Sequence, residues 1–197
     1  PQIDLDDFVG SLVQLVRQDK RWVPASEDSS LYLRPFMFAD EPFVGIRPAH
    51  HFKYLVIGSP VGPYFKGGLS PVSIWVSTDH NRAAPGGTGA AKTGGNYAAS
   101  LMPNRVAKEE GFADCVYLDP LTHTKIDEVG AANFFGITKD GAFVTPVSSS
   151  ILGSITKYSL LQVAKDLGME AEEREVHIDR LDEFAEAGAC GTAAVIT

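Results

Sequence analysis

Cysteine, positive charge and long apolar runs are all scarce in this sequence, and each scarcity excludes a class of protein. Only Cys115 and Cys190 are present among 197 residues, too few for a disulfide framework, which favours a reducing cytoplasm. Lysine and arginine number 17 against 25 acidic residues, and the net charge of −8 without a basic cluster argues against nucleic acid. No apolar run approaches the ~20 residues that span a bilayer, so we expect no membrane partner.

The sequence does have enough apolar content for a core, together with both helix and strand patterns. With 44% hydrophobic residues, the chain can bury one or two domains. Asp4 is suited to cap a helix, and the alternation of Val72, Ile74 and Val76 is typical of a strand. Short strands with helices between them predict a mixed α/β or α+β fold. We expect helices over 5–16, 96–110, 155–167 and 180–186, and strands over 31–38, 54–57, 71–77, 115–118, 132–137 and 142–144.

Two features interrupt these patterns. Pro103 lies inside the expected 96–110 helix. Because an internal proline costs about 3 kcal/mol, we expect a kink there or a later start of the helix. Gly67-Gly68 breaks the strand pattern and indicates a connection between two domains.

The most informative segment is 82–97, RAAPGGTGAAKTGGNY, in which Lys92 stands among glycine, alanine and threonine. Glycines let backbone approach a bulky group closely, since no Cβ intervenes. A lysine in such a setting loses hydration, which favours the neutral amine that attacks carbonyls to form a Schiff base. The alternative is a flexible surface loop that carries a solvated lysine.

A phosphate-binding loop is a further alternative for the same segment. The motif G-x-x-x-x-G-K-[ST] is matched by Gly86, Lys92 and Thr93, but Ala91 replaces the second glycine. The motif also needs a buried strand that runs directly into the loop. The preceding residues are polar and end in Pro85, which argues against a nucleotide-binding protein.

The wider chain resembles a known enzyme family. The segments that carry the resemblance occur in one order: SLYLRP at 30–35, SPVGPYF at 59–65, RAAPGGTGAAKTGGNY at 82–97, EVGAANFF at 128–135 and GTAA at 191–194. Together they resemble the branched-chain amino acid aminotransferases, a pyridoxal-phosphate family of fold type IV. The resemblance runs over nearly the whole chain.

The resemblance implies a transaminase that moves the amino group of leucine, isoleucine or valine to 2-oxoglutarate. Lys92 would hold pyridoxal 5'-phosphate as an aldimine and then move the Cα proton. Glu128 of the E-x-G-x-x-N motif would keep the pyridine nitrogen protonated, with neighbouring Asp127 as the competing candidate. Tyr97 would donate a hydrogen bond to the phenolic oxygen of the cofactor ring.

The cofactor phosphate would be bound by backbone N–H groups at a helix start, where they have no intrahelical acceptor. The resemblance places Ile155 and Thr156 at this turn, Thr192 as a second phosphate contact and Arg82 among the cofactor-binding residues. Many family members have Pro-Gly before this helix, whereas this chain has Gly153-Ser154. We expect the serine hydroxyl to preserve the function.

Substrate contacts are likewise implied by the family. Tyr32 and Arg34 alternate on one strand and so share a face, where the family holds the substrate carboxylate. Val44 and Ile46 match apolar residues that a second subunit contributes to the pocket, which implies a homodimer. The resemblance also assigns Tyr64 and Ala193 to the substrate pocket.

The resemblance also implies a domain layout and a longer protein. Residues 1–65 would complete a small N-terminal domain, 66–70 would connect, and 71–197 would form most of the cofactor-binding domain. We expect segments beyond both ends, including an arginine for the phosphate. Ala194 and Thr197 stand where some members carry a redox Cys-x-x-Cys, so we expect no such switch.

Two other fold type IV enzymes share the lysine and the glutamate. A D-amino acid aminotransferase and an aminodeoxychorismate lyase therefore remain alternatives, although both lack the SLYLRP and PVGPYF motifs. The five histidines have no metal-ligand spacing, so we assign no metal.

Overall fold

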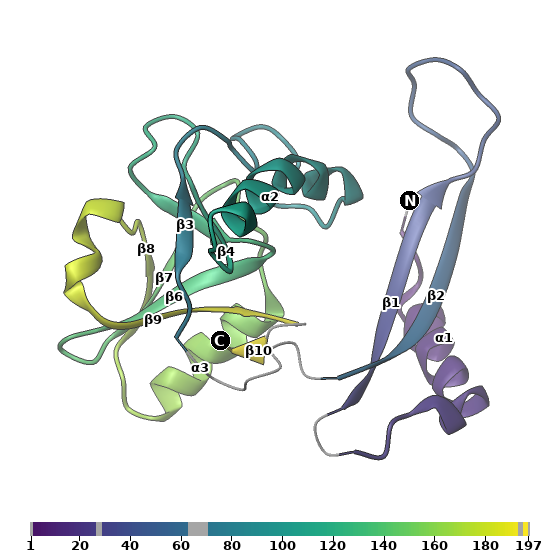
Figure 1. The fold of residues 1–197 in the computed structure, drawn as a ribbon. Helices are drawn as coiled ribbons and strands as arrows, with labels where there is room; N and C mark the ends of the chain where they lie inside the picture. The colour runs from purple at the N-terminus through teal and green to yellow at the C-terminus, as the bar shows by residue number, and fades with distance from the viewer. Residues whose placement is uncertain (1, 27–28, 63–70, 193–194, 197) are drawn as a thin grey trace. The chain divides into compact units, whose positions relative to one another are not determined.

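The computed structural model describes residues 2–26, 29–62, 71–192 and 195–196. The chain divides into two compact units, Pro1–Lys66 and Gly67–Thr197 (Figure 1). The expected connection at Gly67-Gly68 lies outside the described residues. None of the helices in the described segments combines the length and the apolar character needed to cross a bilayer.

The first unit begins with helix α1, Leu5–Gln18, which confirms the helix predicted from the apolar pattern. The Asp4 side chain accepts hydrogen bonds from Asp6 N at 2.9 Å and Asp7 N at 3.4 Å. These N–H groups have no carbonyl partner inside the helix, so the carboxylate supplies the missing acceptor. A short 3₁₀ helix, η1 (Lys20–Trp22), follows α1.

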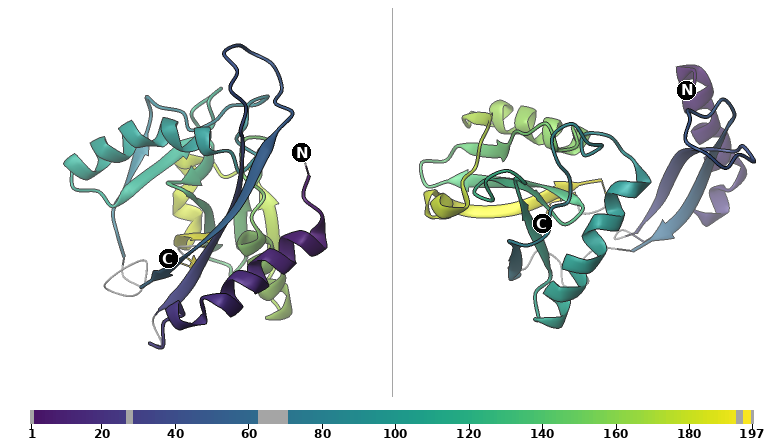
Figure 2. Two further views of the ribbon diagram at one scale, coloured as in Figure 1. Left: turned by 90° about the vertical axis from the view of Figure 1, so that its right-hand side faces the viewer. Right: turned by 90° about the horizontal axis from the view of Figure 1, so that it is seen from above.

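A two-stranded hairpin completes the first unit. Strands β1 (Ser30–Ala39) and β2 (Phe52–Val61) pair antiparallel along their whole length. Helix α1 packs on this hairpin, where Ser11 Oγ lies 3.0 Å from the Tyr54 hydroxyl (Figure 2). We expected the second strand to end at Ser59-Pro60, but it continues to Val61. Proline is tolerated here because a two-stranded sheet leaves one edge of each strand unpaired.

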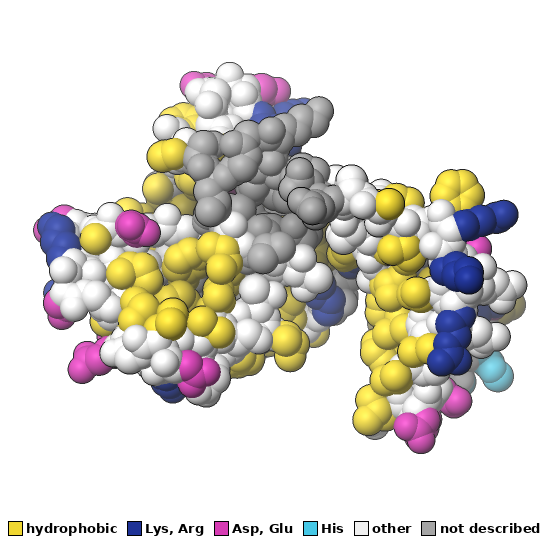
Figure 3. Space-filling view, turned by 90° about the horizontal axis from the view of Figure 1, so that it is seen from below, with side chains coloured by type: hydrophobic (Ala, Val, Ile, Leu, Met, Phe, Trp, Pro, Cys, Tyr) yellow, Lys and Arg dark blue, Asp and Glu magenta, His cyan; other side chains and the backbone are white. Residues whose placement is uncertain are grey.

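The two faces of the hairpin differ. Leu31, Leu33 and Leu15 of α1 gather around Gly58 of β2 on one face. Because side chains alternate along a strand, Phe36 and Phe38 lie on the opposite face, where their rings stack at 6.1 Å. Both phenylalanines are exposed, and Figure 3 shows hydrophobic side chains at the surface of this unit.

The described part of the second unit is built on an eight-stranded sheet. Its order is β10-β9-β6-β5-β4-β3, with β7 beside β6 and β8 beside β7. The pairs β3–β4 and β7–β8 are parallel, and the others are antiparallel. The strands are β3 Ile74–Ser77, β4 Asp114–Leu118, β5 Ile126–Val129, β6 Ala132–Thr138, β7 Phe143–Pro146, β8 Ala171–Arg174, β9 Phe184–Gly191 and β10 Val195–Ile196.

Strands β5, β8 and β9 were not expected from the sequence. β5 has the sequence IDEV and β8 has AEER, so neither shows the apolar alternation of a half-buried strand. Their neighbours in the sheet decide the conformation, since backbone pairing satisfies their polar groups whatever the side chains are. The β3 strand is shorter than expected and begins at Ile74.

Two helices pack on the sheet (Figure 1). Helix α2, Leu101–Glu109, lies against β4 and buries Ala107 beside Cys115 and Tyr117. It follows the 3₁₀ helix η2, Gly94–Ser100, and Pro103 lies in its first turn. The late helix start is therefore confirmed, since a first-turn proline loses no intrahelical hydrogen bond.

Helix α3, Ile155–Asp166, confirms the third predicted helix and ends before Gly168. It buries Leu161 and Ala164 against Phe143 of the sheet. The helix over 180–186 is wrong in part: the 3₁₀ helix η3 spans Ile178–Glu183, and β9 then begins at Phe184. The reason is that Phe184 joins the main core cluster beside Phe134, where an extended backbone pairs with β6.

The turn between β5 and β6 positions the most polar part of the sheet. Gly130 has φ 55°, and a Cβ there would lie 2.2 Å from an Asp114 carboxylate oxygen, so only glycine fits. This tight turn pairs Glu128 of β5 with Asn133 of β6. Both side chains are buried.

Candidate functional site

The glycine-rich loop of the second unit is held by one amide side chain. Asn96 Nδ2 donates to the carbonyls of Thr88 at 2.7 Å and Ala91 at 2.8 Å, and Thr88 Oγ1 donates to Asn96 Oδ1 at 2.5 Å. Gly89 is buried, and a Cβ there would lie 2.2 Å from Ser150 O. The loop is therefore ordered, and glycine is required where it passes another segment.

A small pocket lies between this loop and the β5–β6 turn. Its walls include Arg82, Lys92, Tyr97, Glu128, Asn133 and Leu152. Segments far apart in the sequence thus bring an amine, a phenol, a guanidinium and a carboxylate together. Such convergence of reactive groups in a hollow is what an active site requires.

Lys92 differs from the sequence expectation in one respect. Glycine and alanine neighbours suggested a desolvated lysine, but Lys92 is exposed in the described part of the chain. The side chains of its neighbours are absent or too small to cover the amine, so the small residues leave open space around it. Lys92 Nζ lies 5.8 Å from the centre of the Tyr97 ring, which places these two predicted residues side by side.

Glu128 is the most constrained group of the pocket. Its Oε1 accepts from Leu152 N at 3.1 Å and from Asn133 Nδ2 at 3.3 Å. Its Oε2 pairs with Arg82 Nη2 at 2.5 Å, and the same nitrogen donates to Ser150 O at 3.0 Å. Three donors therefore use three of the roughly four acceptor positions of a carboxylate.

The electrostatics of Glu128 follow from this environment. Burial raises the pKa of Glu128 to about 7, against the opposing effect of Arg82 and the Leu152 N–H. Lys92 also acts to lower this pKa, so its positive charge is felt at the carboxylate. The arrangement has room for one more donor, which would further favour the ionised form.

Asp127 does not share this position. Consecutive residues of a strand point to opposite faces, and Asp127 does not line the pocket that Glu128 enters. Burial raises the pKa of Asp127, while a hydrogen bond with the Ser148 side chain opposes that effect. Strand geometry thus separates two candidates that the sequence left adjacent.

The predicted phosphate-binding residues lie around the pocket without lining it. Leu152 lines the pocket and leads into α3, whose first residues are Ile155 and Thr156. Ser154 is the N-cap, and its Oγ accepts from Lys157 N at 3.3 Å. The N–H groups of the first helical residues have no intrahelical acceptor, so they can bind an anion.

Thr192 is the other predicted phosphate contact. It follows β9, whose Cys190 is paired with Asn133 of β6. A Cβ on Gly191 would lie 3.8 Å from the Ala132 Cβ, so the end of β9 runs close to a residue that neighbours the pocket wall. The end of β9 and the start of α3 are thus both connected to pocket residues.

The predicted substrate residues other than Ala193 belong to the first unit. Arg34 lies 5.0 Å over the Tyr32 ring, so the pair shares a face as expected. Val44 and Ile46 are fully exposed, at 103% and 108%. Tyr64 and Ala193 lie outside the described residues.

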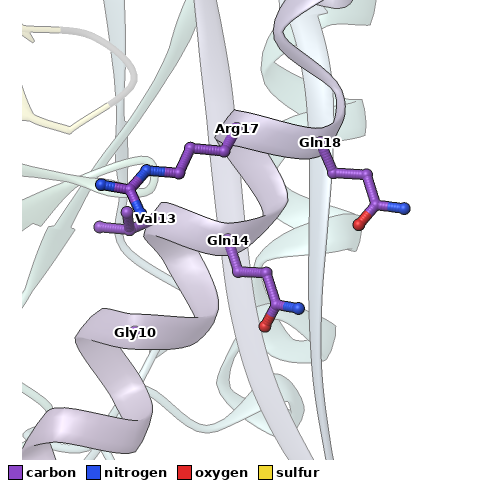
Figure 4. Close-up of a pocket in the computed structure, with 5 residues that line it drawn as sticks. All are labelled: Gly10, Val13, Gln14, Arg17 and Gln18. Carbon is purple, nitrogen blue, oxygen red and sulfur yellow. The ribbon is translucent and has the colours of Figure 1, made fainter.

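A second hollow occurs on α1 but has no reactive groups in convergence. It is lined by Gly10, Val13, Gln14, Arg17 and Gln18 (Figure 4). Arg17 extends beside Val13, whereas Gln14 and Gln18 point away from them. Residues of a single helix cannot surround a ligand, so this hollow is not the candidate site.

Two asparagines were missed as functional residues. Asn96 orders the lysine loop and Asn133 holds Glu128, yet an asparagine in a loop or after a turn is an ordinary sequence feature. The only available signal was their place inside the NY and E-x-G-x-x-N segments.

The phosphate-loop alternative lacks its structural context. Strand β3 ends at Ser77, well before Gly86, so no strand runs directly into the glycine segment. The residues after Lys92 form the 3₁₀ helix η2 rather than an α-helix. A nucleotide loop requires both elements.

Comparison with known proteins gives consistent matches. A family model described as amino-transferase class IV matches residues 1–197. The chain is 56% identical to a branched-chain-amino-acid aminotransferase of Haemophilus influenzae and 50% identical to one of Helicobacter pylori. All of this chain is aligned in both cases, and it spans 59% of the length of each relative.

Solved structures agree in fold. A crystal structure of the Escherichia coli branched-chain amino acid aminotransferase matches with a TM-score of 0.87 and 30% identity. The match covers 100% of this chain and 63% of that one. The mixed α/β architecture is thus that of fold type IV.

Proposed function

Because the chain belongs to the class IV aminotransferase family, we propose that its protein is a branched-chain amino acid transaminase. It would move the amino group of leucine, isoleucine or valine to 2-oxoglutarate. The relatives that support this proposal carry the name branched-chain-amino-acid aminotransferase. Since the chain spans only part of their length, the activity is proposed for the whole protein.

Pyridoxal 5'-phosphate fits the chemistry of the pocket. Among the described residues, Nε of the pocket residue Arg82 is buried without a hydrogen-bond partner, so the pocket retains unused polar capacity. Glu128 has room for one more donor, which a protonated ring nitrogen would provide. Lys92 supplies the amine to which the cofactor aldehyde would be attached.

When bound, the cofactor supplies an electron sink that makes the substrate Cα–H acidic. In the proposal, Lys92 Nζ accepts the proton from Cα and later returns a proton as general acid. Glu128 would offer its carboxylate to the ring nitrogen, and Arg82 favours the ionised form through its 2.5 Å ion pair. Tyr97, beside Lys92, would orient the ring through its hydroxyl.

The remaining predicted residues have binding roles. The backbone N–H groups of Ile155 and Thr156 at the start of α3, with Thr192, would bind the phosphate. Arg82 would act in the cofactor site through its ion pair with Glu128 and not through a contact with the phosphate. The buried, free cysteines are in keeping with a reducing compartment, and we propose the cytoplasm.

Substrate selection would come from apolar surface in the first unit. Tyr32 and Arg34 would hold the carboxylate end of the substrate, and the resemblance assigns Tyr64 and Ala193 to the same task of substrate binding. A homodimer would add Val44 and Ile46 from the partner subunit. Apolar walls favour branched side chains, since each buried methylene contributes about 0.8 kcal/mol.

The observation that carries the proposal is the convergence of Lys92, Tyr97 and Glu128 in one pocket of a class IV fold. Borohydride treatment of the full-length protein with pyridoxal phosphate should label Lys92, located by peptide mass spectrometry. Lys92→Ala should abolish L-leucine transamination while weak cofactor binding remains. Lys157 is the internal control, because Glu173 holds its amine at 2.6 Å.

Labelling at Lys53, Lys66 or Lys125 instead of Lys92 would contradict the assignment. Substrate stereochemistry separates the alternatives within the fold. Turnover of D-amino acids in preference to L-leucine would favour a D-amino acid aminotransferase. Conversion of aminodeoxychorismate would favour the lyase.

A further inference from the structure

The loop between β1 and β2, residues 40–51, combines an ordered base with an exposed apolar tip. We name it the hairpin loop, and Figure 1 shows it projecting beyond the end of the two strands. Val44 and Ile46 at its tip are fully exposed. Loops with few contacts usually sample many conformations, so an ordered loop needs a specific cause.

One carboxylate supplies that cause. Glu41 Oε1 accepts hydrogen bonds from His50 N and, at 2.7 Å, from His51 N. Glu41 Oε2 pairs with Arg47 Nη2 at 2.5 Å. A single side chain on the outgoing limb therefore holds three donors on the returning limb.

A second contact fixes the tip between these limbs. The Arg47 guanidinium lies 4.2 Å over the Phe43 ring, and Arg47 Nη1 donates to Pro48 O at 2.9 Å. Arg47 thus connects Glu41 to the residues on both sides of the tip. We name these contacts of Glu41 and Arg47 the clamp. Val44 and Ile46 lie between Phe43 and Arg47 in the chain, so the clamp holds the loop on both sides of the exposed apolar residues.

The Glu41 contacts differ from an ordinary surface ion pair. Exposed pairs contribute little, because water screens them and long side chains lose entropy. Asp40–Lys53, at 2.6 Å with both side chains about half exposed, is such a pair at the base of the same loop. Glu41 instead accepts two backbone N–H groups, and the His50 N–H is the largest contribution that lowers its pKa.

We propose that Glu41 is the positioning residue that holds the hairpin loop in the conformation that presents Val44 and Ile46 to the substrate pocket of a second copy of this chain. This proposal rests on the proposed function, in which these residues wall that pocket. Glu41 touches no reacting group and acts through Val44 and Ile46. A preformed loop contributes binding energy because little entropy is lost when the substrate arrives.

Hydrogen exchange of the full-length protein tests the clamp directly. In Glu41→Ala, the amides of His50 and His51 should exchange about tenfold faster, since their acceptor is gone. Glu41→Gln should be intermediate, because one oxygen remains to accept while Arg47 loses its anionic partner. Asp40→Asn is the matched control and should leave both amides unchanged.

Substrate discrimination tests the functional half of the proposal. The ratio of kcat/KM for L-leucine to that for L-alanine should fall about tenfold in Glu41→Ala, mainly through the KM for leucine. Alanine should be unaffected because its methyl group is too short to reach the wall. Cofactor absorbance and the thermal midpoint report whether the fold and the cofactor site are intact, and both should match the wild type.

The outcomes separate the inference from the proposed function. Unchanged exchange in Glu41→Ala would overturn the clamp, and faster exchange with an unchanged leucine-to-alanine ratio would overturn its role in selectivity. Leucine turnover by the wild-type protein is measured first. Its absence would refute the proposed function, and the exchange rates would still decide whether Glu41 holds the loop.

Discussion

At the scale of single residues, the burial and the hydrogen bonds of Glu128 say most about what the second unit can bind. It is 4% exposed, yet it keeps the potential for charge because Arg82, Asn133 and the Leu152 N–H all donate to it. An unpaired buried carboxylate would be neutral, whereas a fully paired one has no capacity left for a ligand. A carboxylate that is paired but still has one acceptor position left suits a group that must respond to a bound cation.

The choice between Glu128 and Asp127 can be tested by isosteric amides. Glu128→Gln should lower kcat for L-leucine by on the order of 10²-fold, because the ring nitrogen loses its carboxylate partner. Asp127→Asn should keep most of the activity, since its side chain points to the opposite face of β5. Steady-state kinetics of both variants decide, and the reverse pattern would identify Asp127 as the cofactor acid.

The raised pKa of Glu128 predicts a pH-dependent stability of the cofactor-free protein. The folded state keeps this proton up to about pH 7, while the unfolded chain releases it near 4.5. The folded state therefore binds more protons between these values, and its stability falls as pH rises through this window.

Denaturant titrations from pH 4 to 8 measure this effect as a difference between two proteins. Wild-type stability minus Glu128→Gln stability should decrease between pH 4.5 and 7 and be level above pH 7. Taking the difference cancels the pH-dependent contributions of the titrating groups that both proteins share. A difference that rises with pH would show that Arg82 outweighs burial.

At the scale of elements, α3 joins the sheet to the predicted phosphate site. Lys157 in its first turn is buried and pairs with Glu173 of β8 at 2.6 Å. Leu161 and Ala164 pack one turn and two turns further on against Phe143. The helix start is thus held from its packed side, while Ser154 caps the Lys157 N–H, so the N–H groups of Ile155 and Thr156 are the ones that would face a ligand.

The N-cap of α3 offers a direct test of this arrangement. Ser154→Ala removes the acceptor for Lys157 N and should lower stability by about 1 kcal/mol. A looser first turn should also weaken the binding of pyridoxal phosphate to the full-length apo protein, measured by spectroscopic titration. Ser159→Ala, at an exposed position of the same helix, should change neither quantity. Equal cofactor affinity in Ser154→Ala would remove α3 from the phosphate site.

At the scale of the whole molecule, the predicted catalytic and substrate residues are divided between two units. Lys92, Tyr97 and Glu128 lie in the second unit, and Arg34 and Val44 lie in the first. Val44 and Ile46 are fully exposed on the hairpin loop, so they are available to a second copy of the chain. In the proposed homodimer, each copy would contribute this loop and receive that of its partner.

Charge at the loop tip should damage this arrangement. Val44→Asp in the full-length protein should raise the KM for L-leucine about tenfold, because a carboxylate would be desolvated against an apolar pocket. It should also weaken the dimer, which analytical ultracentrifugation would detect. Val23→Asp, at an exposed valine of the same unit, is the control and should leave both unchanged. An active wild-type monomer would contradict the assembly.

Local chemistry by itself determined much of the fold. The Asp4 cap and the apolar stripe specify α1, and Pro103 specifies the late start of α2, because these signals act within one helical turn. The alternation of Tyr32 and Arg34 likewise follows from strand geometry alone. Order along the chain also made Lys92 and Glu128 recognisable, since each stands in a distinctive segment.

Only the tertiary structure decided the rest. The acidic strand β5 and the charged strand β8 form because neighbouring strands satisfy their backbones, which no local pattern reveals. The exposure of Lys92 and the pairing of Arg82 with Glu128 likewise depend on segments that are distant in sequence. Charge, burial and hydrogen bonding at a site are properties of residues brought together in space, so they become defined only when the chain has folded.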